Sequence, residues 1–239
     1  MPTNHATPFV LIPGFMLDES LWDELVAQFP GDRKIYRANL LTGDNIPQIA
    51  KQIAHQAPER FILVGFSLGG YVARSVVEQF PERVAALVLI ASSLRPDTPE
   101  QKQLKEVSVK AAAQTRFKGL GTASIIKSLH PQRSGDKALI ERIRQMGMQL
   151  GYDEFAKQSL LDRSDLATHL IQCPTLIIAA AQDGLRLPEE ADELHRAIPG
   201  SRLEIIEDTG HMIPLEQPQA LNKVIANWLN EINEGDGTP

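Results

Sequence analysis

Residues 61–81 read FILVGFSLGGYVARSVVEQFP. A continuously apolar run ends at Gly65, and a single serine, Ser67, then precedes Gly69, Gly70 and an amphipathic pattern. The apolar residues of that pattern recur at every fourth position, which is typical of a helix: Leu68, Val72, Val76 and Phe80. The stretch therefore predicts a buried strand, a sharp turn at Ser67 and a helix.

The residues from Gly65 to Gly69 form the pattern G-x-S-x-G. In such a strand-to-helix turn the serine has a strained backbone, and its hydroxyl projects above the sheet. The flanking residues are small because the backbones of strand and helix come close together there. The N–H groups at the start of the helix could stabilise a developing oxyanion. Ser67 is therefore a candidate nucleophile.

Two other interpretations of this turn stay open at this point. Ser67 could be an ordinary helix N-cap of an α/β protein. A nucleotide-binding turn is disfavoured, because GFSLGG lacks the second glycine of G-x-G-x-x-G and no Lys-Ser/Thr of a P-loop follows. The decision depends on whether the chain supplies a base and an acid for Ser67, since a serine hydroxyl alone is a weak nucleophile.

Short apolar runs alternate with longer amphipathic patterns along the rest of the chain. The predicted strands are residues 9–12, 34–40, 61–65, 84–91, 175–181 and 202–206. Most are continuously apolar, as in parallel strands covered on both faces, whereas the last alternates and suits an edge. Helices are predicted over residues 18–29, 68–80 and 214–232, the first with a capping-box spacing at Ser20 and Asp23. The alternation predicts a doubly wound α/β sheet.

The alternation is interrupted once, between about Leu94 and Ala167. Apolar residues there recur at helical spacings, so we expect three or four short helices inserted into a single domain that spans residues 1–239. We expect this insertion, residues 94–167, to form a helical cap over the site, with a decorative insertion as the alternative. Arg163 could bind a substrate carboxylate, although a surface ion pair with Asp162 or Asp165 is the favoured expectation.

Of the six histidines, His211 is the candidate base for Ser67. It follows the last predicted strand and stands beside Gly210, whereas the other five have polar, helical or terminal surroundings. Asp183, after the fifth strand, is the candidate acid, although Asp-Gly is also a common turn pair, and Asp208 is the competing acid. Because Ser67, Asp183 and His211 each follow a different strand, at the edge where α/β sites form, together they predict a catalytic triad.

Composition limits the classes of function. The chain has 24 Lys and Arg against 30 Asp and Glu, a net charge of −6, which argues against a nucleic-acid partner because such a partner needs a basic stripe. The single cysteine, Cys173, allows no intrachain disulfide and is expected to be a small buried residue rather than a nucleophile. No signal peptide or membrane span is predicted, so we expect a cytoplasmic protein without a membrane partner, either a monomer or a homodimer.

These segments resemble the α/β-hydrolase superfamily, and in particular its small capped members such as carboxylesterases. The likeness runs over residues 9–229 and is carried by GFSLGG, CPTLIIAAAQDGLRLP and EDTGHMIPLEQP, which match the family's nucleophile, acid and histidine segments. The stretch LIPGFMLDESLW resembles the family's oxyanion loop. The resemblance implies that the backbone N–H groups of Phe15 and Leu68 form the oxyanion hole, and that the insertion is the family's cap.

The chain departs from the family's pattern at two points. The family usually has His-Gly in the oxyanion loop, whereas this chain has Pro13-Gly14, in which Gly14 still permits the turn. Only eight residues precede the first predicted strand, so we expect the family's opening strand pair to be absent. The expectation is then a mostly parallel, six-stranded sheet with helices on both faces.

The resemblance implies a serine hydrolase that cleaves an ester or related acyl bond of a small molecule through an acyl-enzyme. Ser67 would attack the carbonyl, His211 would move the proton and Asp183 would orient His211, with no metal or organic cofactor. A serine at this position argues against the superfamily's dehalogenases and epoxide hydrolases, which use aspartate. A thioesterase, a lactonase, a C–C bond hydrolase and an aminopeptidase stay open, as does a non-catalytic small-molecule-binding protein, because fold alone does not identify the substrate.

Overall fold

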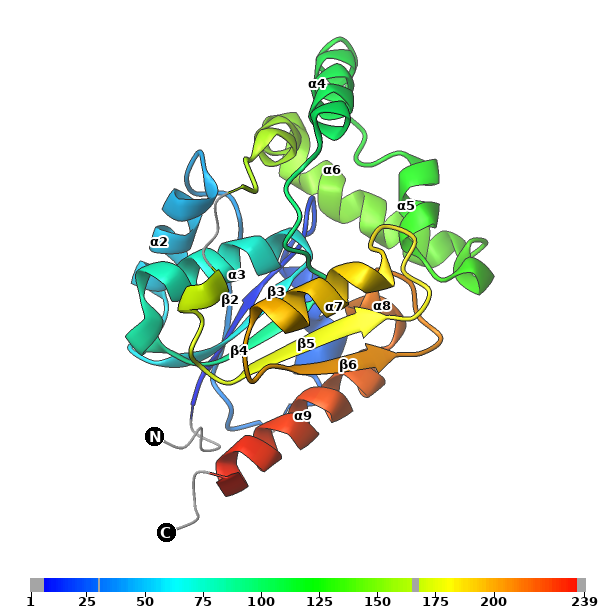
Figure 1. Ribbon diagram of the computed structural model, residues 1–239. Helices are drawn as coiled ribbons and strands as arrows, with labels where there is room; N and C mark the ends of the chain where they lie inside the picture. Colours follow the sequence, from blue (N-terminus) through cyan, green and yellow to red (C-terminus); the bar gives the residue numbers. More distant parts are fainter. Residues whose placement is uncertain (1–6, 30, 165–167, 236–239) are drawn as a thin grey trace.

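The computed structural model describes residues 7–29, 31–164 and 168–235, and its centre is a six-stranded sheet (Figure 1). Neighbouring strands are all parallel, in the order β2-β1-β3-β4-β5-β6. The strands are β1 (Phe9–Ile12), β2 (Ile35–Arg37), β3 (Phe61–Phe66), β4 (Val84–Ile90), β5 (Thr175–Ala180) and β6 (Arg202–Ile206). The predicted strands and fold class are confirmed, with β6 at an edge, although β2 is shorter than its predicted range of 34–40.

Helices cover both faces of the sheet, so alternate side chains of the same strand enter two separate cores. Val10 and Leu63 belong to the core under the first group of helices, and Leu11 and Val64 belong to the core under the second. The first group is α2 (Ile46–Gln56), α3 (Leu68–Gln79) and α7 (Pro188–Ala197). The second group is η1 (Glu19–Trp22), α1 (Asp23–Val26), α8 (Ile213–Glu216) and α9 (Pro218–Gly235), of which α9 lies on the opposite side from α3 and α7 (Figure 1).

Two predicted helices differ in the structure for local reasons. The segment predicted as one helix over 18–29 is the short pair η1 and α1, and its cap is Asp18, whose carboxylate accepts from the Ser20 N–H at 2.9 Å. The predicted capping box at Ser20 and Asp23 is therefore wrong. The last helix is interrupted at Gln217, which has an extended φ of −136° because it precedes Pro218, and a residue before proline is disfavoured in a helix.

The insertion lies above the sheet and consists of α4 (Pro99–Ala113), α5 (Thr122–Ser128), the single turn η3 (Pro131–Arg133) and α6 (Lys137–Leu160) (Figure 1). The last helix is longer than the short helices that we expected, with 24 residues. It is broken at Gly151, whose φ of 83° and ψ of 179° are not helical. Apolar residues of α5 and α6, among them Ile125 and Ile143, share one core with the sheet, so the insertion packs on the rest of the domain.

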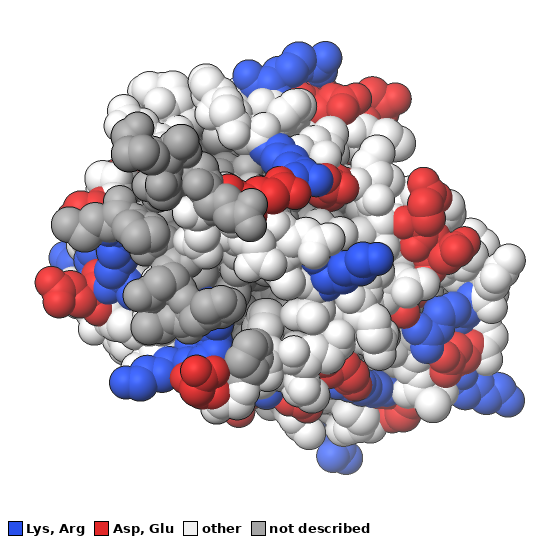
Figure 2. All heavy atoms as spheres, turned by 90° about the horizontal axis from the view of Figure 1, so that it is seen from below, with Lys and Arg blue, Asp and Glu red and all other residues white. Residues whose placement is uncertain are grey.

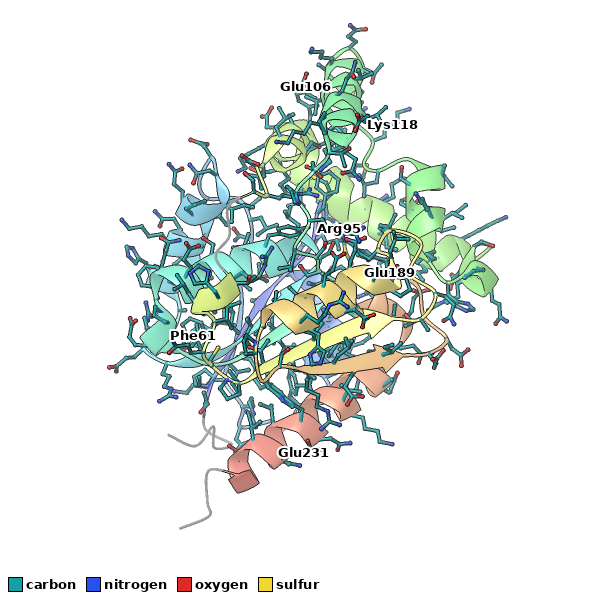
Figure 3. All side chains as sticks on the ribbon, in the orientation of Figure 1. Phe61, Arg95, Glu106, Lys118, Glu189 and Glu231 are labelled. Atoms are coloured by element: carbon teal, nitrogen blue, oxygen red, sulfur yellow. The ribbon has the colours of Figure 1, made fainter. Side chains whose placement is uncertain are left out.

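Ion pairs hold the segment that leads from β4 into the insertion. Arg95 points toward α7 (Figure 3), where it pairs with Glu193 at 2.7 Å. Two residues later, Asp97 accepts from Lys105 of α4 at 2.5 Å. The start of the insertion is therefore fastened both to the sheet domain and to its own first helix.

Arg163 differs from its predicted environment. It is mostly buried, and its guanidinium pairs with Asp97 at 3.3 Å, so that the segments entering and leaving the insertion are joined. The expected surface pair with Asp162 is wrong, since Asp162 lies 3.8 Å from Lys102 instead. Asp165 lies outside the described residues. The same Asp97 carboxylate also pairs with Lys105, so one negative charge is shared by two cations, and the role of Arg163 in binding a substrate carboxylate stays a prediction.

Three glycines of the 61–81 stretch are required by close contacts. A Cβ on Gly65 would lie 2.5 Å from the carbonyl oxygen of Gly69, and a Cβ on Gly69 would lie 2.4 Å from that of Pro13. A Cβ on Gly70 would lie 2.3 Å from the Ser92 hydroxyl. Real Cβ atoms essentially never come this close to another heavy atom, so the start of α3 sits against β1, β3 and the loop after β4 only because these positions are glycine.

We predict that Gly69→Ala destabilises the protein. Alanine favours a helix by about 1 kcal/mol over glycine. Overpacking against the rigid Pro13 carbonyl costs about 3 kcal/mol, which exceeds that gain. The free energy of unfolding, measured by urea denaturation, should therefore fall. The matched control is Gly135→Ala, where a Cβ meets nothing within 4 Å and a change within about 0.5 kcal/mol is expected. Equal effects of the two substitutions would contradict the contact argument.

Candidate active site

Ser67 occupies a strained turn between β3 and α3. Its φ of 50° and ψ of −111° lie outside the regions that residues other than glycine favour, at a cost of about 1–3 kcal/mol. The turn is held because the Ser67 N–H donates to the Ile90 carbonyl at 2.8 Å and the Ser92 hydroxyl donates to the Ser67 carbonyl at 3.0 Å. Its side chain makes no N-cap hydrogen bond, so the interpretation of Ser67 as an ordinary cap is not supported.

The structure brings the three predicted residues together from three separate loops. The Ser67 hydroxyl lies 2.9 Å from His211 Nε2, and His211 Nδ1 lies 2.8 Å from Asp183 Oδ2. Ser67 and His211 retain 8% and 4% of their exposure, so the pair is almost covered. One imidazole therefore bridges a hydroxyl and a carboxylate, which is the arrangement that a serine nucleophile with a histidine base needs.

Asp183 is oriented by its own loop as well as by His211. Its other oxygen, Oδ1, accepts from the N–H groups of Leu185 at 2.7 Å and Arg186 at 2.9 Å. Burial opposes ionisation of this carboxyl, but the charge of His211 and the hydrogen bonds from His211, Leu185 and Arg186 outweigh burial and lower the pKa of Asp183 below its ordinary value. The carboxylate is therefore ionised at neutral pH, as a partner of a protonated histidine must be.

The competing acid, Asp208, has a different position. It is exposed, with a left-handed φ of 54°, and its backbone carbonyl accepts from the Gln217 side chain at 3.1 Å. Its carboxylate is not the one that faces His211 Nδ1, because Asp183 takes that place. The geometry therefore favours Asp183 over Asp208 as the partner of His211.

The two expected oxyanion donors flank the same turn. Leu68 follows Ser67 directly and begins α3, and Phe15 lies in the loop that leaves β1. The close approach of Gly69 to the Pro13 carbonyl places that loop against the first turn of α3. Within the described part of the chain, neither the Phe15 N–H nor the Leu68 N–H donates to another group. Both donors are therefore free for an oxygen atom of a ligand.

A buried carboxylate near the site was not identified from the sequence. Glu216 of α8 accepts from the Gly210 N–H at 2.8 Å and, through its other oxygen, from the His130 N–H at 2.7 Å. It thereby ties the loop that carries His211 to the insertion. Its only sequence signal is its place five residues after His211 in GHMIPLEQP, which does not reveal a partner as distant as His130.

Residues 127–130 of the insertion press directly on the loops of the candidate acid and base. A Cβ on Gly184 would lie 2.4 Å from the Lys127 carbonyl, and a Cβ on Gly210 would lie 2.4 Å from the His130 nitrogen. The Met212 N–H also donates to the Ser128 carbonyl at 3.3 Å. These contacts place the insertion over two of the three loops that form the site.

Other candidate groups have no comparable geometry. Burial raises the pKa of Cys173 to about 11, which makes its thiol a poor nucleophile. His195 lies 2.9 Å from the Ser201 hydroxyl, but both residues lie toward the surface and Ser201 is not on a strained turn. His5, a terminal histidine, lies outside the described residues.

The described residues hold neither a cluster of metal ligands nor a membrane-spanning helix. They contain no group of three or more His, Cys, Asp or Glu side chains that could hold a metal ion. None of their helices is both long and apolar enough to span a bilayer. On the face shown in Figure 2, acidic and basic side chains are interspersed rather than gathered into a basic stripe.

The chain is similar in sequence to proteins of known family. A family model described as the alpha/beta hydrolase fold matches residues 48–218. The pimeloyl-[acyl-carrier protein] methyl ester esterase of Nitrosomonas europaea is 26% identical, over 91% of this chain and 93% of that protein. The monoacylglycerol lipase ABHD6 of Mus musculus is 24% identical, over 98% of this chain and 78% of that protein.

A solved structure adds to this likeness. A thermophilic esterase from Thermogutta terrifontis is 26% identical and superposes with a TM-score of 0.82, over 97% of this chain and 92% of that chain. The family model covers more than half of the chain, and its range contains Ser67, Asp183 and His211. The predicted family is confirmed: the chain belongs to the α/β-hydrolase fold family.

Proposed function

We propose that the protein is a serine hydrolase that cleaves a carboxylic ester of a small molecule. The observation that carries this proposal is the continuous hydrogen-bonded chain from Asp183 through His211 to the strained Ser67. The names of the relatives support an ester as the scissile bond, since they include a methyl ester esterase, a monoacylglycerol lipase and a thermophilic esterase.

In the proposed reaction, the Ser67 hydroxyl attacks the ester carbonyl carbon while His211 Nε2 accepts the hydroxyl proton. The carbonyl oxygen becomes an oxyanion, which accepts hydrogen bonds from the Phe15 and Leu68 N–H groups. The imidazolium then gives its proton to the alcohol as the C–O bond breaks, which leaves an acyl group on Ser67. Water, deprotonated by His211, releases the acid, and Asp183 keeps the imidazole oriented and stabilises its charged form throughout.

We further propose that the insertion, residues 94–167 of a single-domain chain, is a cap that selects the acyl group. Its segment 127–130 presses on the loops of Asp183 and His211. Near the loop that follows β1, the ring centroid of Phe155 in α6 lies 6.0 Å from that of Phe15 and 5.1 Å from that of Phe117. These aromatic side chains form an apolar roof beside the oxyanion loop, which suits an aliphatic or aromatic acyl group.

The other predicted activities remain to be separated by experiment. Thioesters, lactones and activated C–C bonds can react through the same acyl-enzyme, whereas a non-catalytic binding protein would turn over none of them. We keep the prediction of a cytoplasmic protein, monomeric or homodimeric, which needs no metal or organic cofactor. A hydrolysis panel of p-nitrophenyl esters, thioesters and lactones distinguishes the chemistries.

We predict that a fluorophosphonate forms a single covalent adduct with Ser67. Intact-mass spectrometry should show one added group on the wild-type protein and none on Ser67→Ala, which should also lose p-nitrophenyl acetate hydrolysis. Ser75→Ala, which removes another buried hydroxyl of α3 whose partner is Gln79 rather than the turn, is the control and should still take up the probe. A wild-type protein that takes up no probe, or a Ser67→Ala variant that is still modified, would sink the assignment.

We predict that Asp183→Asn lowers kcat by about 10³- to 10⁴-fold, because the amide leaves His211 in the wrong tautomer. Asp208→Asn is the matched control, and its kcat should stay within about threefold of the wild type because that carboxylate is exposed. Steady-state hydrolysis of p-nitrophenyl acetate measures both variants. The opposite ranking would transfer the role of the acid to Asp208.

A further inference from the structure

The loop that carries Phe15 has a conformation that its own residues do not favour. It closes a reverse turn in which the Leu17 N–H donates to the Gly14 carbonyl at 3.3 Å. Met16, inside this turn, has a φ of 54°, in the left-handed region that a methionine rarely adopts. A loop of this kind keeps its shape only when other parts of the molecule hold it.

Gln158 supplies a specific hold on this loop. Its side-chain oxygen accepts from the Met16 N–H at 2.9 Å, and the two residues are 142 positions apart. Gln158 is 1% exposed and Met16 is fully buried, so water cannot replace this hydrogen bond. The direction of the amide follows from its neighbours, because its NH₂ group faces the Glu154 carboxylate at 3.5 Å while its oxygen must face an N–H donor.

The half of α6 that carries Gln158 is itself anchored. The break at Gly151 redirects the helix, and Lys157 then donates to the Leu41 carbonyl at 2.6 Å and pairs with Glu154 at 2.6 Å. These contacts fix the position of Gln158 relative to the loop that carries Phe15. The insertion and the oxyanion loop are thereby joined by a buried hydrogen bond beside the Phe15 and Phe155 rings.

We propose that Gln158 is a positioning residue for the oxyanion hole. By holding the Met16 N–H, its amide oxygen fixes the plane of the peptide between Phe15 and Met16. The Phe15 N–H belongs to the preceding peptide, between Gly14 and Phe15. The two peptides share the Phe15 Cα, so fixing the plane of one restrains the direction of the N–H in the other. The inference rests on the proposed function and deepens it, because the insertion then positions an oxyanion donor in addition to covering the site. Gln158 does not itself touch the reacting atoms.

The expected consequence is a loss in kcat without a matching change in KM. An oxyanion exists only in the transition state and the tetrahedral intermediate. A displaced donor therefore raises the free energy of these states and leaves that of the bound ester unchanged. Removing one oxyanion donor altogether costs about 10²- to 10³-fold in kcat in a well-studied protease. A displaced Phe15 N–H should retain part of its effect, so we expect a loss of about 10- to 100-fold.

The test compares Gln158→Met, which keeps the length of the side chain but has no carbonyl, with the exchange Glu154→Gln/Gln158→Glu, which keeps an acceptor oxygen for Met16 and an NH₂ group opposite it. With p-nitrophenyl acetate, Gln158→Met should lose about 10- to 100-fold in kcat with KM within about threefold, and the exchange variant should recover most of that loss. The inhibition constant of a trifluoromethyl ketone, which forms a tetrahedral adduct, should rise in Gln158→Met by the same factor. Gln149→Leu, an exposed substitution on the same helix, is the control and should match the wild type.

The outcomes separate this inference from the proposed function. An active wild type with an unchanged kcat in folded Gln158→Met would overturn the positioning role alone, as would a change confined to KM. If Gln158→Met does not fold, Gln158→Asn, whose amide is one methylene too short to reach Met16, takes its place with the same expectation. A wild-type protein inert toward the esters and the ketone would overturn the proposed function, and this inference with it.

Discussion

The close contact between the ends of β1 and β3 and the first turn of α3 is the constraint on which the rest of the site depends. With glycine at positions 65 and 69, backbone lies against backbone where any side chain would clash. Ser67 is thereby forced to a φ of 50°, and its hydroxyl projects toward His211 instead of capping α3. The packing of the sheet maintains this strain, because β3, which precedes the turn, and its neighbour β4 are buried along their whole length.

The parallel sheet then brings the other parts of the site to the same place. Because β1, β3, β5 and β6 run in one direction, the loops that follow them meet at one edge of the sheet. These loops carry Phe15, Ser67, Asp183 and His211 respectively. The insertion contacts three of them, through Gln158 on the first and residues 127–130 on the last two. The insertion therefore contacts the candidate site at several points.

Sequence reasoning succeeded where the physical signal is local. Continuous or alternating apolar patterns identified the six strands, and glycine spacing with strand order singled out Ser67, Asp183 and His211. It failed where the deciding contact is distant, as for Gln158 and Glu216, whose partners lie 142 and 86 positions away in the chain. It also misjudged helices whose limits are set by single residues. Asp18 rather than Ser20 caps η1, and Gly151 breaks a long helix without ending it.

A crystal structure of the protein after reaction with a p-nitrophenyl phosphonate would test most directly whether the turn at Ser67 faces a preformed site for acyl transfer. We predict phosphorus bonded to the Ser67 Oγ, with one phosphoryl oxygen within about 3 Å of the backbone nitrogens of both Phe15 and Leu68. Phosphorus on another residue, or a phosphoryl oxygen that points away from both N–H groups, would contradict it.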